Sequence, residues 1–142
     1  MRGCCTPGVP LRIVICIDEC QPGNPLRPEK SRMLQCIYWA IADWPQWLLH
    51  RTAAWPVFGL LRSTECEQMP DAGSQLMRLV LSTFFPREGQ SFLRGLMVND
   101  GVGNPYMFKA IFGGFLADDK AHTHIGDLKG ASGGAICSFI FV

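Results

Sequence analysis

The chain has 142 residues and a formal net charge of +1, with 48% hydrophobic and 18% charged residues. Its length suffices for one domain with a buried core. A charge so near zero excludes a global electrostatic attraction to nucleic acid, and the arginines and lysines form no obvious local stripe. The most apolar segment, residues 37–61, is interrupted by charged residues and prolines. It therefore holds no window of about 18 apolar residues that would span a membrane.

The seven cysteines are an odd number at irregular spacing and predict no disulfide framework. The first residues of the chain lack the long apolar stretch of a signal peptide. We therefore expect an intracellular protein whose cysteines are mostly reduced and act as small core hydrophobes. As an alternative, the pairs Cys4–Cys5 and Cys16–Cys20 could hold a metal ion, although no second ligand pair follows at the distance typical of a zinc finger.

Three strands are predicted in the first half of the chain. Residues 11–18 are rich in β-branched side chains and are expected to form a buried strand that ends in Asp18. Residues 34–42 fit a strand or a helix, and their Ile, Tyr and Trp content favours a strand. Residues 55–62 predict a third strand, with Pro56 near its start, where the missing N–H donor costs least.

The pattern changes to helical spacing after Asp71. Apolar residues recur every three or four positions as far as Phe84, which predicts one main helix. Asp71 or Ser74 can cap its start, and Pro86 stops it.

Two further strands are predicted beyond this helix, at residues 92–98 and 106–116, and a turn-rich segment at 99–105 joins them. A short helix is expected at about residues 120–125. Strands interrupted by a single main helix describe an α/β (α+β) fold with a mixed sheet.

Acidic residues follow two of these strands. Asp18 ends the first one, and Asp118 follows residues 106–116, with Asp119 beside it. If the two strands are neighbours in one sheet, their carboxylates emerge at the same edge. Mg²⁺ prefers carboxylate oxygens, and two such ions can clamp the attacking and leaving oxygens of a phosphodiester. The alternative is that these acids cap turns and face solvent, as acids at strand ends commonly do.

Three short segments carry a resemblance to a known family. They read ICIDECQPGNPL at residues 15–26, FKAIFGGFLADDKA at 108–121 and KGASGGAIC at 129–137. Together they resemble a multi-copy, transposon-derived family of protist genomes that is distantly akin to the KDZ and CACTA-type transposases. The order of strand with Asp, two strands, helix and strand with Asp is similar to the first half of the ribonuclease H-like fold of DDE transposases. The resemblance covers roughly residues 11–137.

The resemblance implies roles for individual residues. Asp18 matches the first catalytic, metal-binding acid and Asp118 the second, with Asp119 as the alternative register of the second. The segment from Lys129 resembles the start of a zinc-knuckle-like insertion whose first ligand is Cys137. The implied cofactor is Mg²⁺, the implied partner is DNA, and the implied location is the nucleus.

The same resemblance divides the chain into an N-terminal tail (1–10), a partial ribonuclease H-like domain (11–128) and the start of a truncated insertion (129–142). Ile140 stands where a second zinc ligand is expected, and no residue remains for the third acid. We therefore expect a truncated, inactive remnant of a DDE transposase-like core, with weak or absent Mg²⁺ binding, and we do not expect a zinc site. The alternative function is a non-catalytic module whose sheet docks a protein or DNA.

Overall fold

The computed structural model describes residues 9–23 and 32–116. In chain order, the elements are β1 (Leu11–Cys20), β2 (Leu34–Ile41), α1 (Gln46–Leu49), the 3₁₀ helix η2 (Thr52–Ala54), β3 (Val57–Arg62), α2 (Ser63–Gln68), α3 (Ala72–Phe84), β4 (Leu96–Asn99), β5 (Pro105–Phe108) and β6 (Ala110–Leu116). The fold is α/β (α+β) with few helices, as the sequence predicts, and α3 is its main helix. The helix expected at 120–125 and the insertion expected at 129–142 lie outside the described residues.

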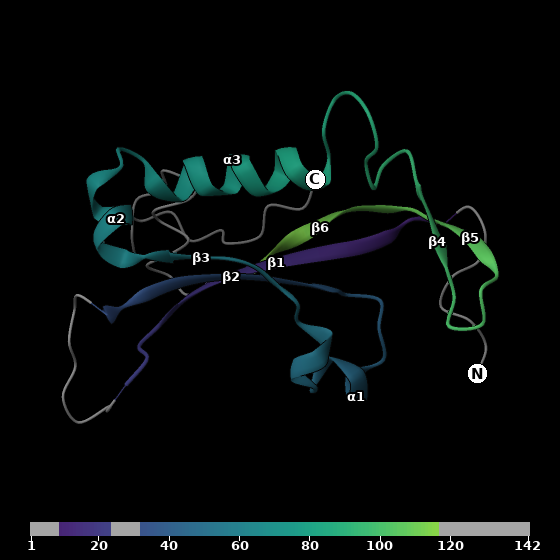
Figure 1. The fold of residues 1–142 in the computed structure, drawn as a ribbon, viewed down its shortest axis with the longest axis horizontal. Coiled ribbons are helices and arrows are strands. Elements are labelled where there is room, and N and C mark those ends of the chain that lie inside the picture. Colours follow the sequence, from purple (N-terminus) through teal and green to yellow (C-terminus); the bar gives the residue numbers. More distant parts are fainter. Residues whose placement is uncertain (1–8, 24–31, 117–142) are drawn as a thin grey trace, which may run out of the picture.

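The main sheet has four strands in the order β3-β2-β1-β6 (Figure 1). β1 pairs antiparallel with β2, and β2 pairs antiparallel with β3. β6, which follows α3 and a separate β4–β5 hairpin, pairs parallel with β1. The sheet is therefore mixed, and the first and last strands of the described chain are neighbours in it.

The core lies between this sheet and α3. Alternate residues of a strand share one face, and in β1 the buried ones are Leu11, Ile13, Ile15 and Ile17. Val80 and Phe84 from α3 belong to the same buried cluster. Burial of each such side chain stabilises the fold by about 1.5–3 kcal/mol. Figure 1 shows α3 along one side of the sheet and α1 on the other.

The start of α3 is in the expected place but is capped differently. Asp71 occupies the N-cap position in a left-handed conformation (φ 50°, ψ 42°), and its side chain makes no capping hydrogen bond. An N-cap residue normally has extended backbone angles when its side chain caps the helix, so the conformation of Asp71 removes that role. The helix ends at Phe84, two residues before Pro86, as predicted.

The strand predicted at 106–116 is two strands in different sheets. β5 pairs with β4 through Phe108, whereas β6 begins at Ala110 and pairs with β1. Lys109 stands between them, and its carbonyl accepts a hydrogen bond from the Leu11 N–H at 2.9 Å. The strand predicted at 92–98 is also shorter, because β4 begins only at Leu96.

The sequence did not predict the short helices α1, η2 and α2. They contain four, three and six residues, too few for a periodic apolar pattern to be visible. Within the described residues, no helix has the length and apolar character needed to cross a lipid bilayer.

Candidate functional site

Asp18 lies within β1, two residues before the strand ends at Cys20. The sequence placed it at the end of a shorter strand, but the ladder with β2 continues as far as the Cys20–Leu34 pair. Asp18 is exposed, on the face opposite the buried isoleucines of β1. Its direct partner across the ladder is Cys36.

The end of β6 lies beside this part of β1. In their parallel ladder, Cys16 is aligned with Leu116, the last residue of β6. The two strands that the sequence analysis paired are therefore neighbours, running in the same direction. The other predicted site residues, Asp118, Asp119 and Cys137, lie outside the described residues.

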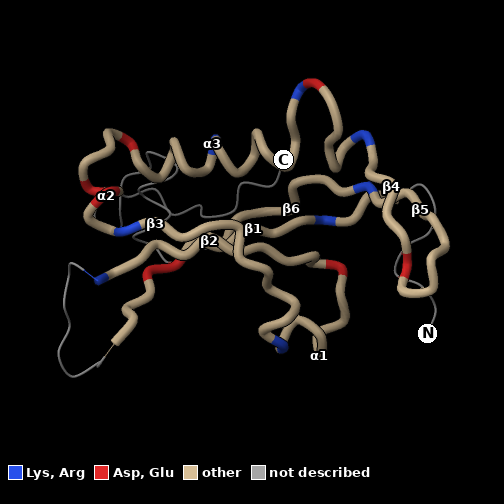
Figure 2. Tube along the Cα trace, viewed as in Figure 1, with Lys and Arg blue, Asp and Glu red and all other residues tan. Residues whose placement is uncertain are grey.

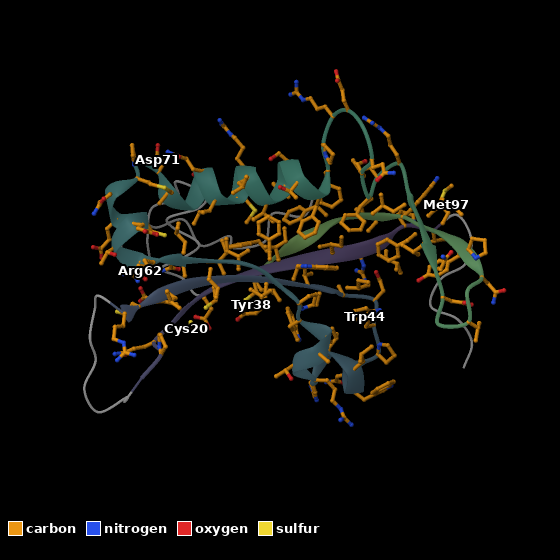
Figure 3. All side chains as sticks on the ribbon, viewed as in Figure 1. Cys20, Tyr38, Trp44, Arg62, Asp71 and Met97 are labelled. Atoms are coloured by element: carbon orange, nitrogen blue, oxygen red, sulfur yellow. The ribbon has the colours of Figure 1, made fainter. Side chains whose placement is uncertain are left out.

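Thiols and a phenol surround Asp18 on the outer face, defined as the sheet face opposite α3. Cys16 and Cys20 flank it along β1, and Cys36 and Tyr38 lie across from it on β2. Figure 3 shows Cys20 and Tyr38 on the side of the sheet away from α3. Cys16, Cys20 and Cys36, expected in the core, are thus half-buried on this face, and the cysteines of the described residues are all free.

Three titratable groups beside Asp18 are held neutral. Burial raises the pKa of Cys36 to about 12, and its hydrogen bond with Cys20 adds to this effect. Burial also raises the pKa of Cys16, as does the charge of Asp18. A hydrogen bond with Cys16, followed by burial, raises the pKa of Tyr38. The thiols of Cys16 and Cys36 and the hydroxyl of Tyr38 are therefore neutral at physiological pH.

Glu19 follows Asp18 but makes contacts of a different kind. Its Oε1 accepts a hydrogen bond from Ser63 Oγ at 2.8 Å and from Gln35 Nε2 at 3.2 Å. Ser63 is buried at the start of α2. These bonds join the ends of β1, β2 and β3, so Glu19 serves to anchor the strand that carries Asp18.

The described side chains fit a magnesium site only in part. Asp18 is exposed and offers the oxygen ligands that Mg²⁺ prefers, whereas the thiols beside it are soft ligands suited to other metals. Across residues 9–23 and 32–116, no three His, Cys, Asp or Glu side chains are arranged to hold a metal ion. Asp18 would supply one ligand, and the remainder would have to come from elsewhere.

Sequence reasoning missed the gathering of thiols around Asp18, although a signal was present. Cys16, Asp18 and Cys20 alternate along a predicted strand, and alternate residues of a strand share a face. The β2 residues opposite them could not be identified, because the register of the two strands is a tertiary property.

Figure 2 shows the Lys and Arg positions of the described residues scattered along the chain trace over several elements, with no stripe near β1. Comparison with known proteins adds no further assignment: no family model, no curated protein and no solved structure matches this chain.

Proposed function

We propose that the chain carries part of a ribonuclease H-like, DDE transposase-like core, in which Asp18 and Asp118 are two of the acids that bind Mg²⁺. The observation that supports this most is the parallel pairing of β1 and β6, which aligns Cys16 with Leu116. Asp18 and Asp118 each follow these aligned residues by two positions. Neighbouring parallel strands end at the same edge of a sheet, so this spacing favours a shared site.

The order of elements supports the same proposal. Three strands paired in sequence, a main helix, and a further strand beside the first match the order implied by the resemblance. The β4–β5 hairpin is an addition to that order, inserted between the helix and the last strand.

The proposed chemistry is binding at a phosphodiester of DNA. Asp18 and Asp118 would hold Mg²⁺ through their carboxylate oxygens, and Gly113 allows β6 to approach β1 closely. When bound, Mg²⁺ supplies charge stabilisation for the attacking and leaving oxygens. The resemblance implies three acids and the proposed site has two, so we expect these two acids by themselves to bind the metal weakly and not to support DNA cleavage.

The binding test is a titration of the full chain with Mn²⁺, a paramagnetic substitute for Mg²⁺, followed by NMR. We expect the amide signals of residues 16–20 and of Cys36 to broaden first. Asp18→Asn and Asp118→Asn should each weaken this broadening several-fold, because a carboxylate ligand is lost. Asp71→Asn is a charge-matched control, since the Asp71 side chain makes no capping hydrogen bond.

Broadening that is centred elsewhere, or that is unchanged in both Asp18→Asn and Asp118→Asn, would contradict the proposed site. If Asp119→Asn weakens the broadening and Asp118→Asn does not, the second ligand is Asp119 rather than Asp118. A DNA-nicking assay in the same buffer tests the inactivity, and robust nicking that Asp118→Asn abolishes would show that claim to be wrong.

A docking function is the second candidate, and the exposed side chains of β3 favour it. Val57 and Leu60 on this edge strand are 61% and 59% exposed. Unpaired edges that carry apolar side chains are sites where other chains add. If the purified chain stays monomeric and captures no partner in a pulldown, this function is excluded.

A further inference from the structure

The segment between β2 and β3 presents a tryptophan to solvent. Trp47 lies on α1 and is 61% exposed, whereas tryptophan side chains are on average highly buried. Two other tryptophans of the same segment follow that average: Trp44 packs against the core, and Trp55 is half-buried. The indole of Trp47 is therefore accessible to a ligand.

The chain around Trp47 is fixed in place by hydrogen bonds. The Leu49 backbone N–H donates to the Pro45 carbonyl at 3.2 Å. The Trp55 Nε1–H donates to the Leu49 carbonyl at 2.8 Å, which closes the segment onto α1. The Trp55 ring in turn packs edge-on against Tyr38 of β2, with ring centroids 5.8 Å apart. Trp47 is thus presented from a support that is attached to the sheet.

This support lies close to Asp18 on the outer face. Tyr38 is two residues along β2 from Cys36, which is the ladder partner of Asp18. Two residues of a strand span about 7 Å. Figure 3 shows Tyr38 on the side of the sheet away from α3, and Figure 1 shows α1 on that same side. A nucleic-acid strand bound at Asp18 can therefore reach α1 without leaving this face.

The charge of the segment fits a polyanion. Residues 44–56 contain three tryptophans, His50 and Arg51, and no acid. Both His50 and Arg51 are exposed. Asp43, the acid that precedes the segment, accepts hydrogen bonds from the Arg12 guanidinium at 2.7 and 3.0 Å, which neutralises its charge. An exposed indole beside a guanidinium is the combination that stacks a base and holds its phosphate.

A single strand fits this surface better than a duplex. In a duplex the face of each base is covered by its neighbours in the stack, so an indole reaches it only after the base is turned out. A single strand offers the face of every base, and its stacking on an aromatic side chain tolerates any sequence. The net charge of +1 also disfavours a duplex, since duplex binding depends on many phosphate contacts.

We propose that this surface is a subsite for single-stranded DNA, in which the Trp47 indole stacks on one base and Arg51 contacts a phosphate beside it. The choice of DNA rests on the proposed function, because the metal site at Asp18 would act on a phosphodiester of the same strand. The subsite itself needs no metal. It makes the substrate of the Asp18 site a DNA strand that is unpaired next to the reacting phosphodiester.

Fluorescence anisotropy of a labelled thymidine oligonucleotide, about 12 nucleotides long, measures this binding by the full chain. EDTA is present, so that the metal site does not contribute. We expect Trp47→Ala to weaken binding about 5- to 150-fold, the usual contribution of one stacked base. Trp47→Phe should keep most of the affinity, because a phenyl ring also stacks. Leu79→Ala, at a position of α3 that is 55% exposed, is the matched control and should bind like the unaltered chain.

Arg51→Ala tests the phosphate contact separately. Loss of one contact to a single strand should reduce the slope of log K against log salt concentration by about 0.7. Arg78→Ala, at an exposed position of α3, is the matched control and should leave the slope unchanged. The melting temperatures of these variants should agree with that of the unaltered chain, since each replaced side chain is exposed.

Absence of binding by the unaltered chain, or equal affinities of the unaltered chain and Trp47→Ala, would overturn this inference. Tighter binding of a duplex or of the corresponding RNA strand would also overturn it. A second copy of the chain is the competing occupant. If Trp47→Ala abolishes self-association in sedimentation velocity and leaves oligonucleotide binding unchanged, the surface is a contact between copies instead.

The Mn²⁺ titration separates this inference from the proposed function. Oligonucleotide binding that depends on Trp47, without Mn²⁺ broadening at residues 16–20, would support the subsite and contradict the metal site. Broadening at residues 16–20 without oligonucleotide binding would support the metal site and overturn the subsite.

Discussion

Asp18 and Glu19 are adjacent near the end of β1, but their surroundings differ. Asp18 is exposed beside Cys36 on the outer face, whereas Glu19 accepts hydrogen bonds from Gln35 and Ser63. The sequence singles out Asp18 through its position after a β-branched run, and nothing in the local pattern distinguishes Glu19 as an anchor. Its partners lie 16 and 44 residues away in the chain, so only the folded structure could reveal this role.

A second residue-scale contact joins the start of β1 to the end of β2. Arg12 Nη2 lies 2.7 Å and Arg12 Nε 3.0 Å from Asp43 Oδ1, while the Arg12 backbone N–H donates to Asp43 Oδ2 at 2.7 Å. The hydrogen bonds and charge of Arg12 lower the pKa of Asp43. The sequence indicated neither partner, since Arg12 is an ordinary charged residue within β1 and Asp43 is one in the turn after β2.

This contact predicts a pH-dependent contribution to stability. Because the pKa of Asp43 is lower in the folded than in the unfolded chain, the contact stabilises the fold above the unfolded pKa of about 3.9. That stabilisation is lost as the pH falls through the folded pKa. We expect Asp43→Asn to lower the urea midpoint at neutral pH and to lose its effect in strong acid.

The measurement is urea unfolding of both chains over a series of pH values. Asp71→Asn is the matched control, and its midpoint should follow that of the unaltered chain throughout. A difference between Asp43→Asn and the unaltered chain that stays constant in acid would show that the ion pair is not its cause.

At the scale of elements, the division of residues 106–116 into β5 and β6 is the largest departure from the predicted pattern. The segment is continuously apolar apart from Lys109, and a periodicity argument has no means to divide it. The division comes from the partners: Phe108 pairs with Leu96, whereas Ala110 pairs with Leu11. Residues 106–116 thus contribute a strand to each of the two sheets.

Gly113 allows the close approach of β6 to β1. The ladder between the two strands shifts register between Ile13 and Val14. A Cβ atom on Gly113 would lie 2.7 Å from Arg12 Cβ and 3.3 Å from the Ile13 carbonyl oxygen. Gly114 has φ +155° and open space around it. Gly113 is therefore required by the contact with β1, and not by its own backbone angles.

Gly113→Ala should destabilise the fold by about 1–3 kcal/mol, the usual cost of inserting a methyl group into packed structure. Gly59→Ala is the matched control, because a Cβ there meets nothing within 4 Å and its strand is also at an edge. Chemical denaturation of the two variants and the unaltered chain measures the difference. Equal stabilities for Gly113→Ala and Gly59→Ala would contradict the role assigned to Gly113.

At the scale of the whole molecule, the two faces of the sheet differ. α3 covers one face. On this side of the sheet, the aromatic rings of Trp39, Phe84 and Phe92 pack against one another with ring centroids 5.3–6.3 Å apart. The outer face carries α1 at one end and the thiols with Asp18 at the other (Figures 1 and 3). Exposed Leu60 lies in the same cross-strand row as Cys36 and Asp18.

We expect the chain to self-associate at high concentration through the edge of this outer face. Leu60 is 59% exposed on an edge strand, and an apolar edge is a template for strand addition. Leu60→Lys should shift the chain toward monomer in sedimentation velocity while leaving the melting temperature nearly unchanged. Leu79→Lys, at a position of α3 that is 55% exposed, is the matched control and should leave the association as it is. If both variants associate equally, the edge of β3 is not the interface.

The sequence by itself determined the elements whose signal is local. The runs of β1, β2 and β3 and the periodicity that ends before Pro86 are visible within windows of ten residues or so, and their approximate bounds are confirmed. The order of these predicted elements also determined the class of fold. These features depend on side-chain alternation and backbone propensity, which neighbouring residues alone define.

Only the tertiary structure decided which elements meet. The parallel pairing of β1 with β6, the row that joins Leu60, Cys36 and Asp18, and the contact of Cys20 with Cys36 all depend on strand order and register. A shift of one residue would turn each of these side chains to the other face. Register is fixed by burial of the isoleucines against α3, a free energy that belongs to the whole fold and that no local segment carries.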